Sequence, residues 1–241
     1  MIIDAEKIVN DTIRVFQTSE VQKKKFAEIT EYVSRDQYET IHPVALTPLD
    51  LEIDCEKFLT EIQTYSNYFY QWGTQHQHLP RYGLALVNQD GILKSNDPIN
   101  GSLYEWNNTH PDAPLLESDC LVPTQVMTME SLRPLSVFNG HWCRSNIFKW
   151  HKGAEFYPHI DTIVPSPWIR LWGTNNPDGL EVKFHNPVTR RMEKVEGIKA
   201  GRIYVIDTSI VHDAVSHDDN TYQFFLSVLP SAYDTILRLL R

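Results

Sequence analysis

The sequence contains little cysteine and no excess of positive charge, and each of these shortages excludes a class of protein. Its three cysteines, Cys55, Cys120 and Cys143, are widely spaced and include no C-x-x-C pair, so we expect reduced thiols and no disulfide framework. Asp and Glu number 31 against 22 Lys and Arg, which gives a net charge of −9. Binding to nucleic acid or to an anionic membrane surface depends on clustered cations. We therefore predict neither kind of partner.

Long apolar runs are also missing. No stretch is long enough to span a bilayer, and residues 1–6 include acidic residues in place of the basic segment and apolar run of a signal peptide. Together with the reduced cysteines, this predicts a cytoplasmic protein. The sequence has no G-x-S-x-G, no P-loop and no G-x-G-x-x-G, so nothing in it indicates acyl transfer or nucleotide-dependent chemistry.

The first third of the chain has helical periodicity. Apolar residues recur at helical spacing in residues 5–16 and 21–33, which predicts two amphipathic helices. A third helix is predicted to begin near Pro48, because proline is favoured in the first helical turn, and to end before Gly73. The aromatic run from Tyr65 to Trp72 falls at helical spacing and is interpreted as packing.

The remainder of the chain is dominated by short β-prone runs. Residues 81–87 are strand-like, residues 89–125 are rich in Asn, Asp, Pro and Gly and predict loops, and residues 128–135 predict a short helix. Further strands are predicted at 143–150, 155–162, 168–173, 180–184, 202–207, 212–215 and 221–229, before a closing helix at 232–241. Many short strands at this spacing indicate a sandwich or jelly roll.

No linker or repeat divides the chain, so we expect a single domain over residues 1–241. Within it, residues 1–80 form a helical support region, residues 81–137 a loop-rich region and residues 138–230 the β core. The 41% hydrophobic content is sufficient for a core of this size.

A His-x-Asp motif lies in one of the predicted strands. His159 and Asp161 would point to the same face of that strand, so two metal ligands would converge. The His-x-Asp motifs that begin at His110 and His217 lie in a loop and a turn, without a strand to fix their geometry. His212 follows a later predicted strand and is the candidate third ligand. Two histidines and one carboxylate with open positions are typical of non-haem Fe(II) sites.

At these residues the chain resembles the Fe(II) and 2-oxoglutarate-dependent dioxygenases, and most of all their proline hydroxylase and aspartyl/asparaginyl hydroxylase branch. The resemblance covers about residues 140–230 and is carried by the segments 159–161, 170–172, 201–207, 212–215 and 225–228. It implies a mainly β fold, a double-stranded β-helix (a cupin-like jelly roll) with supporting N-terminal helices and a short C-terminal helix.

The resemblance also implies an activity. His159, Asp161 and His212 would be the catalytic Fe(II) ligands, with 2-oxoglutarate and O2 as co-substrates. The reaction would be hydroxylation of a C–H bond in an amino acid, or in an amino-acid side chain of a peptide. The expected partner is therefore a small molecule or a peptide.

For 2-oxoglutarate binding, the resemblance assigns a contact to Arg170; the alternative is a surface ion pair. The family usually has a second arginine about ten residues after the distal histidine, where it clamps the remote carboxylate. Here Tyr222 and Gln223 occupy that place and, with Ser227, are the remaining co-substrate candidates on the last strand. Their uncharged groups donate hydrogen bonds without positive charge.

Other basic and aromatic residues have two interpretations each. Arg202 and Lys183 either replace the missing arginine or point outward, and Arg144 and Trp172 either line a substrate pocket or pack in the core. Arg81, just before a strand, is a candidate for gripping an anionic substrate.

His151 and His185 lie beside turns and are interpreted as loop or rim residues outside the metal site. Two alternative functions stay open. One is a cupin-like metalloenzyme that does not use 2-oxoglutarate, supported by the missing arginine, and the other is a non-catalytic jelly-roll binding module.

Overall fold

The computed structural model describes residues 3–16, 20–72 and 81–240. Its helices are α1 (Ala5–Phe16), α2 (Glu20–Glu28), α3 (Arg35–Ile41), α4 (Cys55–Glu61), α5 (Leu103–Thr109) and α6 (Tyr233–Leu239). Short 3₁₀ segments are η1 (Ile62–Tyr68), η2 (Pro98–Asn100), η3 (Glu117–Asp119), η4 (Gln125–Thr128), η5 (Glu130–Phe138) and η6 (Pro230–Ala232). In these described ranges no helix has the length and apolar character needed to cross a membrane.

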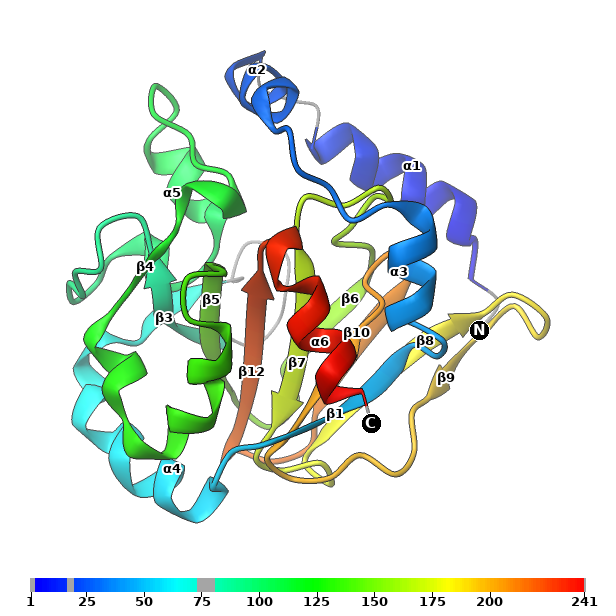
Figure 1. The fold of residues 1–241 in the computed structure, drawn as a ribbon. Helices are drawn as coiled ribbons and strands as arrows, with labels where there is room; N and C mark the ends of the chain where they lie inside the picture. The colour runs from blue at the N-terminus through cyan, green and yellow to red at the C-terminus, as the bar shows by residue number, and fades with distance from the viewer. Residues whose placement is uncertain (1–2, 17–19, 73–80, 241) are drawn as a thin grey trace.

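The strands form two antiparallel sheets (Figure 1). The strands are β1 (Leu46–Glu52), β2 (Tyr70–Trp72), β3 (Arg81–Asn88), β4 (Val122–Pro123), β5 (Trp142–Trp150), β6 (Glu155–His159), β7 (Ile169–Thr174), β8 (Leu180–Asn186), β9 (Arg191–Lys194), β10 (Arg202–Ile206), β11 (His212–Ser216) and β12 (Thr221–Val228). The larger sheet has the order β1-β10-β7-β12-β5-β3-β2, with β4 paired to β3, and the smaller has the order β6-β11-β8-β9.

From β5 to β12 the chain passes repeatedly between the two sheets. β5, β7, β10 and β12 belong to the larger sheet, and the strands that intervene in sequence, β6, β8, β9 and β11, belong to the smaller. A chain that winds through two antiparallel sheets in this way is a double-stranded β-helix, so the predicted fold class is confirmed. Because each crossing places a strand opposite the one before it, residues distant in sequence face one another between the sheets.

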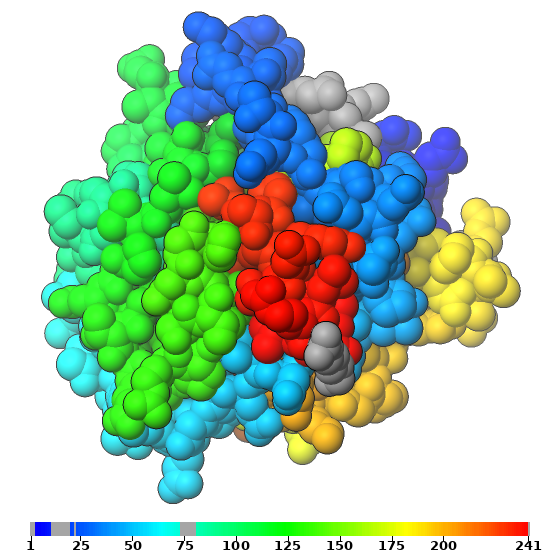
Figure 2. Space-filling model, viewed as in Figure 1, coloured from blue at the N-terminus to red at the C-terminus, as the bar shows by residue number. Residues whose placement is uncertain are grey.

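The two faces of the larger sheet bury different sets of residues. One face packs against the helices in a core that includes Phe58 of α4 and Ile236 of α6, and Figure 1 shows α3 and α6 lying over this sheet. The space-filling view shows the red atoms of α6 between the blue N-terminal helices and the green middle of the chain (Figure 2). The other face meets the smaller sheet in a second cluster, which includes Trp172, Val182 and Ala214.

The N-terminal predictions are confirmed in part. Helix α1 has the predicted bounds, whereas α2 ends at Glu28 and a separate helix, α3, follows from a capping box of Ser34 and Gln37. The predicted helix from Pro48 is wrong. This segment is strand β1 at the edge of the larger sheet, where a proline is tolerated, and helix α4 starts only after Asp54. Its predicted limit at Gly73 lies outside the described residues.

Several boundaries also differ in the β region. The segment 128–135 is 3₁₀ rather than α-helical, α5 lies within the segment predicted as loops, and β9 was not predicted. Strands β1 to β4 come from outside residues 138–230 yet join the larger sheet, so that sheet extends beyond the expected core segment. The closing helix is present as η6 and α6.

Candidate metal centre and its cavity

Three side chains meet where β6 ends and β11 begins. His159 is the last residue of β6 and His212 the first of β11, and the antiparallel register pairs these two residues directly. Asp161 lies beyond the end of β6, so the expectation that it shares a strand face with His159 is wrong. Its backbone N–H instead donates to Thr208 O at 2.9 Å, which ties it to the loop before β11.

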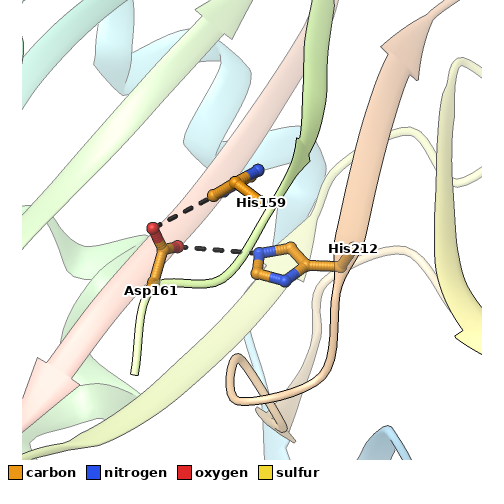
Figure 3. A group of neighbouring side chains, drawn as sticks. All are labelled: His159, Asp161 and His212. Atoms are coloured by element: carbon orange, nitrogen blue, oxygen red, sulfur yellow. Dashed lines mark ion pairs between the residues drawn. The ribbon is translucent and has the colours of Figure 1, made fainter. Parts of the chain in front are cut away.

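The three side chains point toward one another (Figure 3). The carboxylate of Asp161 lies 3.5 Å from Nε2 of His159 and 3.6 Å from Nε2 of His212. One ligand atom from each residue falls within a group no wider than 4.8 Å. Metal–ligand bonds of about 2.0–2.2 Å are compatible with this spacing after small side-chain movements.

Backbone carbonyls fix the tautomers of both histidines. Nδ1 of His159 lies 2.7 Å from Tyr157 O, and Nδ1 of His212 lies 2.9 Å from Ile210 O. A carbonyl can only accept, so Nδ1 carries the proton in each ring and Nε2 keeps its lone pair for a ligand. Nε2 of His159 is buried and has no hydrogen-bond partner among the described residues. This is how metal-binding histidines are commonly oriented.

The charge state of the group also suits a cation. Burial lowers the pKa of His159, which keeps its imidazole neutral at pH 7. The lone pairs of two Nε2 atoms and one carboxylate oxygen therefore face a position where a cation can bind. This donor set fits a non-haem Fe(II) ion.

A cavity of about 630 Å³ opens at these three residues. Its wall includes Ile8 of α1 and side chains from both sheets. The aromatic residues that line it are Trp72, Tyr104, Phe148, Trp150, Phe156, Trp172 and Phe225, and the charged and amide residues other than the metal-ligand candidates are Arg81, Glu105, Glu117, Arg144, Arg170, Asp213 and Gln223. The site is thus largely apolar with a few ionic groups, as small-molecule sites usually are.

Arg170 lies in the cavity wall and is not part of a surface ion pair. It is 5% exposed, and its guanidinium contacts both carboxylate oxygens of Glu117 at 3.1 Å and donates to Ser227 Oγ. Burial alone would lower the pKa of Arg170, but Glu117 outweighs it and raises that pKa. Arg144, also in the wall, contacts Glu117 at 3.7 Å and donates to Gly101 O at 2.8 Å.

Glu117 was not among the site residues predicted from the sequence. It is a single acidic residue in the segment predicted as loops, and only the fold brings it to two arginines from β5 and β7. Trp172, for which packing and pocket were both considered, has both roles, because it belongs to the intersheet cluster and lines the cavity.

The three co-substrate candidates on β12 have different positions. Gln223 faces the cavity, where its Oε1 accepts from Trp150 Nε1 at 3.0 Å. Tyr222 points to the opposite face and packs against Phe58 at a ring distance of 5.4 Å, so the structure does not bring it to the cavity. Ser227 is fully buried beside Arg170. The alternation of a strand explains the difference, since adjacent residues face opposite sides.

Neither proposed replacement for the missing arginine reaches the cavity. Arg202 donates to Leu49 O and pairs with Asp50 and Glu52. Lys183 pairs with Glu181 at 2.9 Å. The interpretation of both as outward-facing charges is confirmed.

The histidines left outside the site remain there. His151 contacts Asp219 at 3.2 Å on the surface, and the group of possible metal ligands in the described chain contains neither His151 nor His185.

Arg81, the candidate for gripping an anionic substrate, lies in the cavity wall beside Trp72. Trp72 packs as predicted, since it belongs to the intersheet cluster, and it also lines the cavity, where its ring centre lies 4.0 Å from the Cζ atom of Arg81. Phe156 lies at the same distance from that Cζ atom. Arg81 is 1% exposed and contacts both rings, which stand edge to face 6.2 Å apart.

Comparisons with known proteins give structural similarity only. No family model matches the sequence, and no curated protein matches it. Similar solved structures include a prolyl-4-hydroxylase from Pseudomonas putida (12% identity, TM-score 0.41, covering 76% of this chain and 90% of that one). A 2OG-Fe(II) oxygenase family oxidoreductase from Burkholderia pseudomallei has 13% identity and a TM-score of 0.39, with 70% and 78% covered.

A cupin-type structure is similar as well. A predicted oxalate decarboxylase from Thermotoga maritima has 8% identity and a TM-score of 0.33, covering 68% of this chain and 94% of that one. The function is therefore inferred from this chain's own residues.

Proposed function

We propose that the protein is a non-haem Fe(II) and 2-oxoglutarate-dependent dioxygenase, with His159, Asp161 and His212 as the metal ligands. The observation that carries the proposal is the convergence of two lone-pair-bearing Nε2 atoms and one carboxylate at the wall of a cavity. Two histidines and one carboxylate leave coordination positions open to ligands, which is the arrangement that non-haem Fe(II) oxygenases use.

The bound metal would supply the oxidative chemistry with O2, and the chain's own residues would bind and orient the reactants. Apolar rings such as Trp172 and Phe225 would exclude water from the cavity, while the ionic groups of its wall would fix the orientation of a charged ligand. Holding a substrate carbon close to the metal converts an encounter between separate molecules into a reaction within one complex.

We take an amino acid, or an amino-acid side chain in a peptide, as the substrate, and hydroxylation of one of its C–H bonds as the reaction. Glu117, Arg144 and Arg170 support this substrate class, because two arginines share one carboxylate and leave a net positive charge in the cavity wall. The carboxylate of an amino acid complements such a charge.

A cupin-like metalloenzyme that does not use 2-oxoglutarate is the second candidate. It is favoured by one observation: the cavity-facing position on β12 where a carboxylate-binding arginine would be expected holds Gln223. An amide offers hydrogen bonds to a carboxylate but no charge.

The decisive experiment is an anaerobic titration of the Fe(II)-loaded protein with 2-oxoglutarate, followed by visible absorption. We expect a weak charge-transfer band when the keto acid chelates the metal, and no band in His212→Ala. Bound iron without a band would favour the cupin-like enzyme. Failure of the wild-type protein to bind iron would contradict both metalloenzymes.

A further inference from the structure

We propose that Arg81 anchors the remote carboxylate of a dicarboxylate co-substrate, in place of the arginine that β12 lacks. This inference rests on the function proposed above. Arg81 is the first residue of β3, and the sheet places it directly beside Trp72 of β2 and Trp150 of β5. The anchor would therefore come from a strand outside the segment β5 to β12.

The guanidinium of Arg81 lies against aromatic rings, and Asp161 and Glu105 act on it electrostatically without an ion pair to it among the described residues. Its Cζ atom lies 4.0 Å from the ring centres of Trp72 and Phe156 and 5.1 Å from that of Trp150. In the described part of the chain, no carboxylate forms an ion pair with Arg81, and its buried Nε has no hydrogen-bond partner. The rings of Trp72 and Phe156 stand edge to face, 6.2 Å apart at 77°. They therefore contact different sides of the guanidinium, which also lines the cavity.

The other two arginines of the cavity differ from Arg81 in sharing a carboxylate of the protein, although the buried Nε of each also lacks a hydrogen-bond partner among the described residues. Arg170 has both oxygens of Glu117 and Ser227 Oγ, and Arg144 has Glu117 and Gly101 O. A buried, unpaired cation is costly, so a carboxylate ligand would bind most favourably where the protein provides none. Burial lowers the pKa of Arg81 to about 9, so it stays protonated at neutral pH.

Gln223 lies at the same end of the cavity. The indole N–H of Trp150 can only donate, so the group within 3.0 Å of it is the oxygen of the Gln223 amide, and the amide nitrogen remains a donor. Because Trp150 contacts both Gln223 and Arg81, one carboxylate can be bound by the amide and the guanidinium together.

Arg81 lies close to the candidate metal ligands. The ring of Phe156 lies 4.0 Å from Arg81 Cζ and 3.8 Å from the ring of His159, so one side chain separates the guanidinium from a metal ligand. A five-carbon keto acid can chelate a metal with its keto-carboxylate end and extend its remote carboxylate across that width. A keto acid without the remote carboxylate would reach the metal but not Arg81.

The test compares 2-oxoglutarate with 2-oxobutyrate, which lacks the remote carboxylate. Dissociation constants are measured by calorimetry on anaerobic Fe(II)-loaded protein, and the measured quantity is the ratio of the two constants. We expect the wild-type protein to prefer 2-oxoglutarate by about 10- to 100-fold, the range for a hydrogen-bonded charge pair. In Arg81→Gln the ratio should approach one, because 2-oxoglutarate binding weakens while 2-oxobutyrate binding does not.

Three further variants test whether the preference for 2-oxoglutarate depends specifically on Arg81. Arg81→Lys keeps the charge without the two-pronged geometry and should give an intermediate ratio, and it carries the test where Arg81→Gln does not fold. Arg202→Gln, which alters an outward-facing arginine, should leave the ratio unchanged. Arg170→Gln should also keep the preference for 2-oxoglutarate.

The inference is overturned by an unchanged ratio in the Arg81 variants, by a wild-type protein without preference, or by loss of the preference in Arg170→Gln alone. A separate arm uses His212→Ala and glutarate, a dicarboxylate with no keto group. Glutarate binding that is lost on adding Arg81→Gln supports the anchor even if no iron binds. Failure of the anchor and failure of the proposed function are thus distinguishable.

Discussion

Two backbone carbonyls orient the imidazole rings at the cavity: Tyr157 O accepts from His159, and Ile210 O accepts from His212. Each carbonyl lies two residues before its histidine, so the local chain path orients the ring. The metal-binding orientation is therefore built into the ends of β6 and β11. A ligand held in this way loses less side-chain freedom when the metal binds.

Replacing His159 or Asp161 by alanine should abolish iron binding and leave the fold intact, because the cavity around both residues tolerates smaller side chains. The measurement is iron per chain after anaerobic loading and desalting, with circular dichroism as the check on folding. His185→Ala, outside the candidate centre, is the matched control and should retain iron. Unchanged iron content in His159→Ala and Asp161→Ala would disprove the assignment of the ligands.

The carboxylate of Glu117 offsets the buried positive charges of Arg144 and Arg170. Glu117→Gln leaves Arg144 and Arg170 without their shared carboxylate, so we expect a loss of about 3–5 kcal/mol in the free energy of unfolding. Denaturant unfolding measures this loss. Glu130→Gln, which breaks the exposed ion pair with Lys57, should cost less than about 1 kcal/mol. Equal effects would show that Glu117 stabilises the protein no more than a surface charge.

At the scale of elements, helix α4 begins at a side-chain cap. The side chain of Asp54 accepts from the backbone N–H of Lys57 at 3.0 Å and caps the helix. Asp54→Ala should lower the free energy of unfolding by about 0.5–2 kcal/mol. Asp54→Asn preserves the cap and should stay near the wild-type value. A loss of the same size in both variants would indicate that the carboxylate charge matters and the cap does not.

The error at Pro48 has a specific physical cause. Proline is compatible both with the first turn of a helix and with an edge strand. The alternation of Leu49, Leu51 and Ile53, all buried, is the competing signal for a strand. Pairing of β1 with β10, over 150 residues away, decides between the two, and such pairing has no local signature.

For the whole molecule, the sequence was sufficient to predict the alternating strands, the fold class and the three residues that converge at the cavity. The strands depend on short-range periodicity and the candidate ligands on a motif, whereas the double-stranded β-helix was implied by the family resemblance. The partner of Arg170 and the rings around Arg81 could not be predicted, because Glu117, Trp72 and Phe156 come from separate elements that only the tertiary fold brings together.

A metal bound at this centre should stabilise the entire domain, since its ligands connect β6, the following loop and β11. At a free metal concentration 100 times the dissociation constant, the gain is about 2.7 kcal/mol. For a domain of this size, that gain corresponds to a rise in Tm of about 5–10 °C. Thermal unfolding with and without Mn²⁺ measures it. His212→Ala should show no rise, and an equal rise in that variant would place the metal elsewhere.

The alternation along β12 has a consequence for altering this protein. Gln223 and Phe225 face the cavity, whereas Tyr222 and Phe224 face the helix-covered core. Laboratory evolution of ligand choice can therefore randomise Gln223 and Phe225 while Tyr222 and Phe224 are held constant. Substitutions that face the cavity would change ligand recognition, and substitutions that face the helices would change folding.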